Sequence, residues 1–147
     1  MIVSGSFHVP TDKESVYRMF TNVEKLTTCV PGVDQLRVLG DNRYEAEMTV
    51  KIQFMTIKFA VNGELTEEIP GQKLLVQMSG QPAKLAGLFQ NRLTANFAEV
   101  EPRLTEVTYS MEVRMSGRLA SLGEILIKST IEKSAKQFVG NVNQLFQ

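Results

Sequence analysis

The chain has 147 residues, which suits one domain that can bury a hydrophobic core without a disulfide or a metal ion. Its 16 basic residues balance its 16 acidic residues, which argues against a general nucleic-acid binder with a basic surface. No apolar run approaches the roughly 20 residues of a membrane span, and the N-terminus lacks the features of a signal peptide. With one cysteine, Cys29, no disulfide forms within the chain, and these features together favour a cytoplasmic protein.

The first elements are predicted to be a strand and two short helices. Ile2–Val9 contains alternating apolar residues and is followed by a proline, which indicates a strand. Thr11–Glu14 has the T-x-x-E form of a helix capping box, and Thr21–Glu24 repeats this start signal. The second helix is expected to end near Cys29, because Pro31 disfavours helical geometry at the residue before it.

Several later segments alternate apolar and polar residues, which is typical of strands with one solvent-facing side. The clearest run extends from Tyr44 to Phe54, after a hairpin signal at Gly40–Asn42. A turn of type II is expected at Pro70–Gly71. The further alternating runs span residues 57–65, 74–78, 93–97 and 107–115. Successive strands of this kind predict an antiparallel sheet that is covered on one side only.

The segment from Arg118 to Phe146 predicts a long helix that covers this sheet. Apolar residues recur there at steps of three and four, and no proline interrupts the pattern. A helix of this length would extend about 43 Å at ~1.5 Å per residue, which is enough to cross the sheet. Gly123 and Gly140 weaken the helix: Gly123 could allow a close approach or a bend, and Gly140 could let the end fray.

The interval from Gly80 to Gln90 breaks the strand pattern. It places three apolar residues, Leu85, Leu88 and Phe89, among glycines and a proline. We expect a long loop at one end of the sheet. Two interpretations stay open at this point, a broad hairpin connection without function or a flap over the mouth of a pocket, since exposed apolar loop residues need a reason.

The residue types that carry catalysis do not cluster in this sequence. The only histidine, His8, lies on the strand face opposite Phe7 and Val9, and Cys29 is expected to be a buried structural thiol. No metal-ligand cluster, phosphate-binding loop, dinucleotide fingerprint or nucleophile elbow is present. The sequence therefore predicts no catalytic residue, no metal site and no cofactor. It favours a binding module, which needs only a shaped apolar cavity with a few polar anchors.

Two segments have a distinctive sequence, namely Cys29–Gly32, with Cys-Val-Pro-Gly, and Gly117–Gly123, with Gly-Arg-Leu-Ala-Ser-Leu-Gly. Together with Phe7–Thr11, Val16–Tyr17 and Tyr44–Ala46, they resemble the CoxG family, the G-subunit family of carbon monoxide dehydrogenase, within the START-like (SRPBCC) superfamily. The resemblance extends over almost the whole chain and implies one START-like domain over residues 1–147.

The resemblance implies an α+β helix-grip fold. In that fold a curved antiparallel sheet of about seven strands wraps around a long C-terminal helix, with two short helices after the first strand. It also implies a deep hydrophobic cavity between sheet and helix that holds a lipid-like or quinone-like molecule. Because the subgroup is associated with molybdenum-containing carbon monoxide dehydrogenase, it further implies such an enzyme as a partner.

The candidate lining of this cavity comes from the strand phase and from the facing helix stripe. It consists of Met48, Val50, Phe59, Val61, Met78, Leu88, Phe89, Phe97, Tyr109, Met111, Leu122 and Leu126. Leu88 and Phe89 are expected to close the mouth, and Tyr109 could supply a polar anchor. The seven methionines are either ordinary core residues or part of a pocket wall that adapts to a variable ligand.

Three functions follow from these features. The first is a non-enzymatic carrier of a hydrophobic small molecule. The second is an assembly or recruitment factor that contacts its partner through an apolar patch at residues 85–89. The third is a START-like cyclase or hydrolase, which would need a buried carboxylate or histidine facing the cavity, whereas the strand phase directs His8 away from it.

Overall fold

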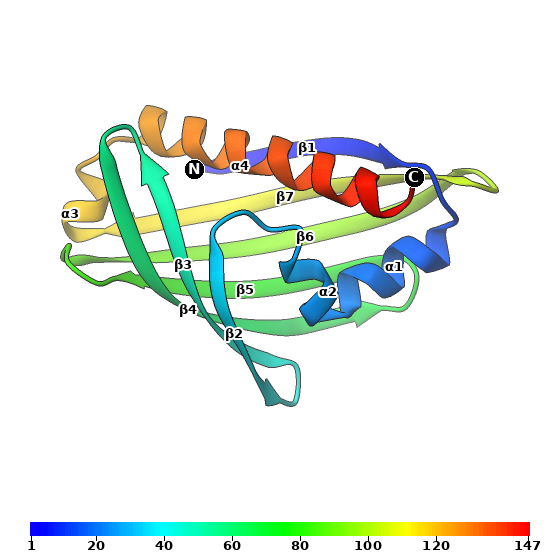
Figure 1. The fold of residues 1–147 in the computed structure, drawn as a ribbon, viewed down its shortest axis with the longest axis horizontal. Helices are drawn as coiled ribbons and strands as arrows, with labels where there is room; N and C mark the ends of the chain where they lie inside the picture. Colours follow the sequence, from blue (N-terminus) through cyan, green and yellow to red (C-terminus); the bar gives the residue numbers. More distant parts are fainter.

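The computed structural model describes all residues, 1–147, and contains one seven-stranded antiparallel sheet that curves around a long C-terminal helix (Figure 1). The strands are β1 (Ile2–Val9), β2 (Val33–Gly40), β3 (Arg43–Ile52), β4 (Met55–Ile69), β5 (Lys73–Pro82), β6 (Gly87–Glu101) and β7 (Leu104–Ser116). The helices are α1 (Lys13–Thr21), α2 (Val23–Thr27), α3 (Gly117–Ala120) and α4 (Glu124–Leu145). The predicted α+β helix-grip architecture is therefore confirmed.

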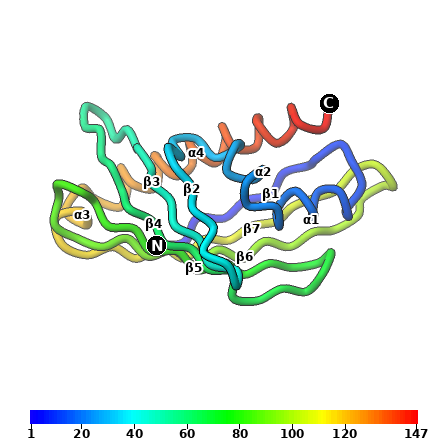
Figure 2. The backbone as a smooth tube through the Cα atoms, turned by 60° about the horizontal axis from the view of Figure 1, so that its bottom comes forward, coloured from blue at the N-terminus to red at the C-terminus, as the bar shows by residue number.

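The strands follow the order β1-β7-β6-β5-β4-β3-β2 across the sheet. Strands β2 to β7 each pair with their neighbour in sequence, whereas β1 pairs with β7 at the far edge. In Figure 1, β2 and β3 run steeply across the view while β6 and β7 run along it, so the sheet is strongly curved. Helix α4 contacts both β1 and β3, which lie near opposite edges of the sheet, so the sheet curls around the helix (Figure 2).

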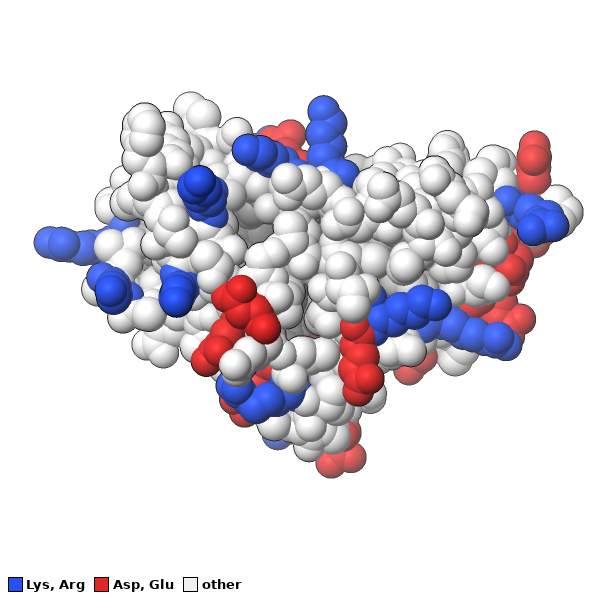
Figure 3. Space-filling view, viewed as in Figure 1, with Lys and Arg blue, Asp and Glu red and all other residues white.

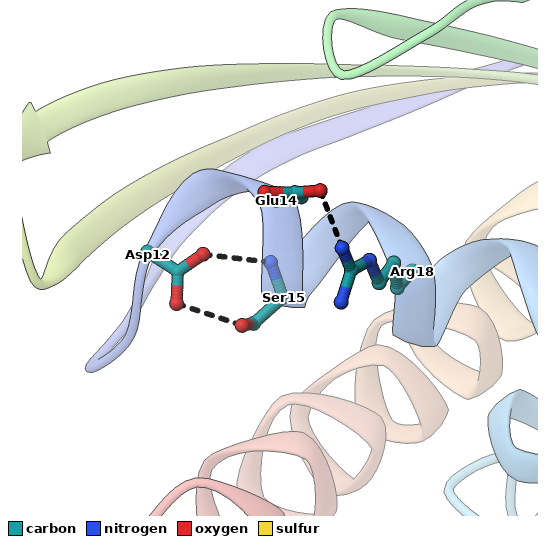
Figure 4. A network of polar contacts seen from close by, with 4 residues as sticks. All are labelled: Asp12, Glu14, Ser15 and Arg18. Atoms are coloured by element: carbon teal, nitrogen blue, oxygen red, sulfur yellow. Dashed lines mark hydrogen bonds and ion pairs between the residues drawn. The ribbon is translucent and has the colours of Figure 1, made fainter.

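Helix α1 begins one residue later than the capping box indicates. Asp12, not Thr11, is the cap, because its carboxylate accepts hydrogen bonds from the Ser15 backbone N–H at 3.0 Å and from the Ser15 hydroxyl at 2.7 Å (Figure 4). These bonds satisfy an N–H that has no partner within the first turn. Glu14 does not complete a capping box but forms an exposed ion pair with Arg18 (Figure 4).

The other helix starts also depend on single residues. Asn22, not Thr21, caps α2, with its side-chain oxygen accepting from the Lys25 N–H at 3.2 Å. The predicted C-terminal helix is divided into α3 and α4 at Gly123, whose φ of +95° is favourable for glycine. The bend expected at this glycine is present. None of the helices combines the length and apolarity needed to cross a lipid bilayer.

The prediction of a long loop between Gly80 and Gln90 is wrong. Strand β5 continues to Pro82 and β6 begins at Gly87, so only residues 83–86 connect the two strands. A Cβ atom at Gly87 would collide with the backbone oxygen of Ser116. The glycine that interrupts the alternation therefore permits a close approach to the start of α3 and does not mark a loop.

The β3–β4 hairpin turns earlier than the alternation of its sequence indicates. Ile52 pairs with Met55, which leaves Gln53 and Phe54 as the two turn residues. Gln53 has a φ of +53°, and the Phe54 side chain is fully exposed, although the sequence pattern assigns it to the apolar face. The tip of this hairpin therefore presents an aromatic ring to solvent.

The most tightly packed part of the core lies where α1 and α2 cover the sheet. Its buried members are Val9, Val16, Tyr17, Met19, Cys29, Leu74, Ala95, Phe97, Val107 and Val142. The Phe20 ring packs edge-on against Phe97 and Phe138, with ring centroids 5.2 and 5.8 Å apart. We call this group of residues the packed end, and it includes Cys29 as the buried thiol that the sequence predicts.

Candidate functional site

The register of the strands determines which side chains share the concave face of the sheet. Met48 lies opposite Phe59, and Met78 lies opposite a glycine on one side and Asn91 on the other. Helix α4 lies on this same side, because the ring of Phe7 in β1 packs edge-on against Phe138 of α4. All strand residues nominated for the cavity lie on this face except Leu88.

Leu88 faces the opposite side of the sheet. It pairs with Ser116, whereas the next residue, Phe89, pairs with Met115 on the concave face. Leu88 is 37% exposed on the outer face, so it cannot close a mouth together with Phe89. The expectation fails because these residues belong to β6, where successive side chains alternate between faces, and not to a loop.

Most of the nominated strand residues face α4, two nominated leucines lie at or just before the start of α4, and all of these residues stay partly exposed. They are Met48, Val50, Phe59, Val61, Met78, Phe89, Tyr109, Met111, Leu122 and Leu126, and we call this group the open end. Phe97 is the exception, since it is buried in the packed end. The accessible surface of the whole chain is 8914 Å², against roughly 7,500 Å² expected for a monomer of 16.4 kDa. The chain as a whole therefore exposes more surface than a compact monomer of its mass, and the partly exposed residues of the open end contribute to this surface.

The surface view agrees with this arrangement. Figure 3 shows recesses near the middle of the face, in the region between the β2–β3 strands and the α1–α2 helices. Uncharged side chains surround most of the recesses, acidic side chains lie just below them, and Lys and Arg side chains gather toward the left end (Figure 3). A concave surface is the usual form of a site for a small molecule.

Two glycines deepen the floor of the open end. Gly63 and Gly80 occupy concave positions in β4 and β5, where a side chain would otherwise project inward. A Cβ atom at Gly63 would meet only the Met78 side chain, at 3.7 Å, and one at Gly80 would touch Phe59 and Val61 at 3.6 Å. Both positions thus have room for at least a methyl group that the sequence does not supply.

Asn91 is a polar residue at the centre of this apolar face. Its side chain projects between Met78 and Val113, the residues opposite it on β5 and β7, and the residue is 7% exposed. The Nδ2 atom donates to the sulfur of Met111 at 3.5 Å. The Oδ1 atom is the one buried side-chain nitrogen or oxygen of the protein that has no hydrogen-bond partner. An unpaired buried acceptor of this kind costs about 1–3 kcal/mol of stability.

Asn91 is absent from the predicted lining, although the sequence contains a signal for it. The alternation of Phe97, Ala95 and Leu93 continues backward to residue 91, which places its side chain on the concave face. Interpreting residues 80–90 as a loop stops the strand pattern before it reaches this position. Asn91 is therefore an addition that the structure makes to the candidate site.

Tyr109 lies beside the edge strand β1. Its ring packs against Phe7, with centroids 6.3 Å apart, and its hydroxyl lies over Gly5, where a Cβ atom would be only 2.7 Å away. The absence of a side chain at Gly5 makes room for the tyrosine. The hydroxyl makes no hydrogen bond within the protein, so its role as a polar anchor stays a prediction.

The strongest perturbation of a titratable group occurs outside the open end. The Tyr17 hydroxyl donates to the Glu68 carboxylate at 2.5 Å, and burial together with this carboxylate raises the pKa of Tyr17 well above its usual value. The phenol therefore stays protonated at neutral pH. His8 lies 3.3 Å from Glu106 on the outer face of the sheet and is exposed, in agreement with its strand phase.

The open end contains no carboxylate or histidine on its strand positions, and its one acidic side chain is the Tyr109 phenol. No group of three or more His, Cys, Asp and Glu side chains in the protein could hold a metal ion. A groove of about 740 Å³ lies on the outer face of the sheet, and its lining is mainly polar and charged, although the inward strand positions Gly63, Met78 and Asn91 also border it. Side chains such as Gln77, Gln90 and Arg92 surround that groove, so it does not suit the apolar molecule expected from the sequence.

The sequence matches the family model for the G subunit of carbon monoxide dehydrogenase (CoxG) over residues 5–146. The chain belongs to the CoxG family. The resemblance seen in the Cys-Val-Pro-Gly segment and in the Gly117–Gly123 segment is thereby confirmed. No curated protein matches this CoxG-family chain.

Solved structures share its fold at low sequence identity. A conserved protein from Geobacillus kaustophilus has a TM-score of 0.91 and 17% identity, over 99% of this chain and 95% of that chain. A START superfamily protein from Mycobacterium smegmatis has a TM-score of 0.70 and 16% identity, over 98% of both chains. An aromatase/cyclase from a Streptomyces species has a TM-score of 0.69 and 10% identity, over 98% of this chain and 92% of that chain. These similarities establish a START-like fold for this CoxG-family chain.

Proposed function

We propose that this CoxG-family chain is a single START-like domain that binds a hydrophobic small molecule, lipid-like or quinone-like, at the open end and releases it unchanged. The observation that carries the proposal is the partial exposure of apolar side chains that face α4, among them Met48, Met78 and Met111. A ligand that covers these side chains contributes roughly 25 cal/mol for each Å² of apolar surface it removes from water. Flexible methionines allow the wall to adapt to the ligand's shape.

We propose a binding role and not catalysis because the open end offers no carboxylate, histidine or thiol, and the Tyr109 phenol there has no neighbouring base to activate it. The carboxylate and histidine that such chemistry needs are missing from its inward strand positions. The aromatase/cyclase shares the fold at 10% identity, which does not transfer its activity. We also propose a cytoplasmic location, in keeping with the single free thiol of Cys29.

The test is to purify the protein without detergent, extract it with organic solvent and identify co-purified molecules by mass spectrometry. Titration with decylubiquinone and with palmitic acid then measures binding directly. We expect a stoichiometric apolar molecule in the extract or saturable binding of at least one probe. A clean extract combined with no binding of either probe would refute the proposal.

A second candidate function is recruitment to a partner, and the apolar end of the molecule favours it. The β3–β4 hairpin, residues 83–86, α3 and the start of α4 lie together at one end (Figures 1 and 2). Phe54 is fully exposed there and Ile125 is 89% exposed. Five nearby cations form no ion pair, namely Lys51, Lys58, Lys84, Arg118 and Lys128. Figure 3 shows Lys and Arg gathered at this end.

We propose that the partner at this end is an acidic surface of a molybdenum-type carbon monoxide dehydrogenase, the enzyme for which the family is named. The patch expected at residues 85–89 is reduced, because Phe89 faces inward. The test therefore uses Phe54→Ser with Ile125→Ser and measures association with that enzyme in a pull-down. We expect association to be lost while palmitic acid binding is retained. Unchanged association would eliminate this surface, and Val100→Ser at the other end of β6 is the matched control.

A further inference from the structure

Asn91 and Thr105 are the two buried polar residues of the protein, and Asn91 differs in having an unpaired acceptor. The Thr105 hydroxyl, fully buried, donates to the Thr11 carbonyl at 2.9 Å, and the amide of the half-buried Asn141 donates to the Cys29 carbonyl at 2.9 Å. Each of these contacts ties two elements of the packed end together. The hydrogen bond of the Asn91 carboxamide to the Met111 sulfur links only β6 and β7, two strands that the sheet already pairs.

The chemistry of this contact determines which atom is left free. The sulfur of Met111 carries no proton and can only accept, so the amide nitrogen of Asn91 faces it and Oδ1 is directed elsewhere. An amide oxygen without a partner accepts a hydrogen bond from an O–H or N–H group. The free position is thus specific for a donor.

The surroundings of Oδ1 are apolar and adaptable. Met78 lies on one side of Asn91 across β5, Val113 lies on the other across β7, and Phe89 and Leu93 are the next concave residues on β6. The two methionines near Asn91, at positions 78 and 111, have three rotatable side-chain bonds each, so they can turn aside when a ligand enters. In this environment a hydrogen bond to Oδ1 is shielded from competing water.

We propose that Asn91 is the polar anchor of the site and that the ligand is an apolar molecule carrying a hydroxyl group, which donates to Oδ1. A long-chain alcohol or the reduced, dihydroxy form of a quinone meets this requirement, and a pure hydrocarbon does not. This inference rests on the proposed binding function and names its ligand class. It also explains why a polar side chain interrupts the apolar face of a central strand.

The experiment compares two probes that differ in one donor, 1-decanol and its methyl ether. Their dissociation constants are measured by calorimetry for the full chain and for Asn91→Leu, which has nearly the same shape without the amide. We expect the unaltered protein to bind decanol about tenfold more tightly than the ether, and we expect Asn91→Leu to bind both equally. We also expect Asn91→Leu to raise the Tm of the unliganded protein, because the unpaired acceptor is gone.

The controls separate this inference from the underlying proposal. Asn96→Leu makes the same change at an exposed position on the outer face of β6 and should leave the preference for decanol intact. If Asn91→Leu does not fold, Asn91→Val, with better strand propensity, takes its place. Binding of both probes without preference, or a lower Tm for both Asn91 variants, would overturn the anchor while leaving ligand binding in place. Binding of neither probe nor of decylubiquinone and palmitic acid would instead refute the proposed function.

Discussion

The packed end and the open end share one sheet and one alternation of residues, yet they differ in how completely their apolar side chains are covered. In the packed end, Val9 and Val142 are 0% exposed and Met19 is 2% exposed. In the open end, Met48 and Met78 face the same way but stay partly exposed. The difference comes from the elements that cover them. Helices α1 and α2 and the last turns of α4 seal the packed end, whereas the open end has α4 above it and two glycines in its floor.

The contrast shows that periodicity determines the face of a side chain but not its neighbours. A strand with an apolar inner face serves equally well over a solid core and over a cavity. A solid core and a cavity differ in how many side chains fill the space above the sheet. Here Gly63 and Gly80 have no side chain to fill it. The packed end thus stabilises the sheet, while the open end leaves space for the proposed ligand.

The largest expected effect on stability comes from truncating one methionine in the packed end and comparing it with one in the open end. Met19→Ala leaves a closed void in the packed end, so we expect a loss of about 2–5 kcal/mol in the free energy of unfolding. Met78→Ala enlarges a space that solvent already reaches, so the expected loss is under about 1.5 kcal/mol. Urea denaturation of both variants measures the difference. Equal losses of unfolding free energy would mean that the packed end and the open end are packed alike.

A smaller effect is expected from the Tyr17–Glu68 pair in the packed end. Because the pKa of Tyr17 is raised in the folded protein from the ordinary value of 10.0, the unfolded chain loses this proton first as the pH rises. The contribution of this pair to the free energy of unfolding should therefore be constant below about pH 10 and should fall as the pH rises above that value. Tyr17→Phe should flatten this part of the pH profile.

The control for the Tyr17 experiment is Tyr44→Phe, which removes a partly exposed phenol on β3. This variant should keep the alkaline fall in stability. Guanidinium denaturation between pH 8 and pH 11 follows all three proteins. A fall that persists unchanged in Tyr17→Phe would show that the pair with Glu68 does not contribute to stability in the way its geometry suggests.

The smallest effect on stability, with a large effect on binding, is expected from Gly63→Val. The Cβ atom has room, the backbone φ is not in the left-handed region, and valine favours a strand, so stability should change by less than about 1 kcal/mol. The added side chain occupies the floor of the open end and should weaken palmitic acid binding at least fivefold. Gly71→Val, in the β4–β5 turn, is unsuitable as a control because its φ is +74°. Thr108→Val on the outer face of β7 serves instead, and equal binding by Gly63→Val and this control would show that the floor of the open end does not contact the ligand.

Much of the fold can be predicted from the sequence, because alternation and helical spacing are strong local signals. They assign Met48 and Phe59 to the correct face, and the turn of Pro70–Gly71 is present with Gly71 at positive φ. Errors arise where a tertiary contact decides the outcome. Gly87 resembles a loop residue in the sequence, although it is needed for a close approach to Ser116. The loop interpretation therefore places Leu88 at the pocket mouth, whereas Leu88 lies on the outer face of β6.

The site itself is less accessible to prediction. The inner face of the sheet follows from strand phase, but its incomplete cover depends on where α4 lies after the bend at Gly123. Asn91 can be found from the phase of β6, whereas its unpaired oxygen cannot, because that depends on the position of the Met111 sulfur on the neighbouring strand. The proposed hydroxyl group of the ligand can therefore be inferred only from the structure and not from the sequence.

The most direct test of ligand binding at the open end uses the methionines as built-in reporters. With ¹³C-labelled methionine methyl groups, the NMR signals of Met48, Met78 and Met111 are followed during titration with decylubiquinone and 1-decanol, alongside those of Met19 in the packed end and Met55 on the exposed hairpin. We predict saturable shifts at the three open-end methionines and none at Met19 or Met55. Shifts confined to Met55, or no shift at any open-end methionine while a probe is bound, would contradict binding at the open end.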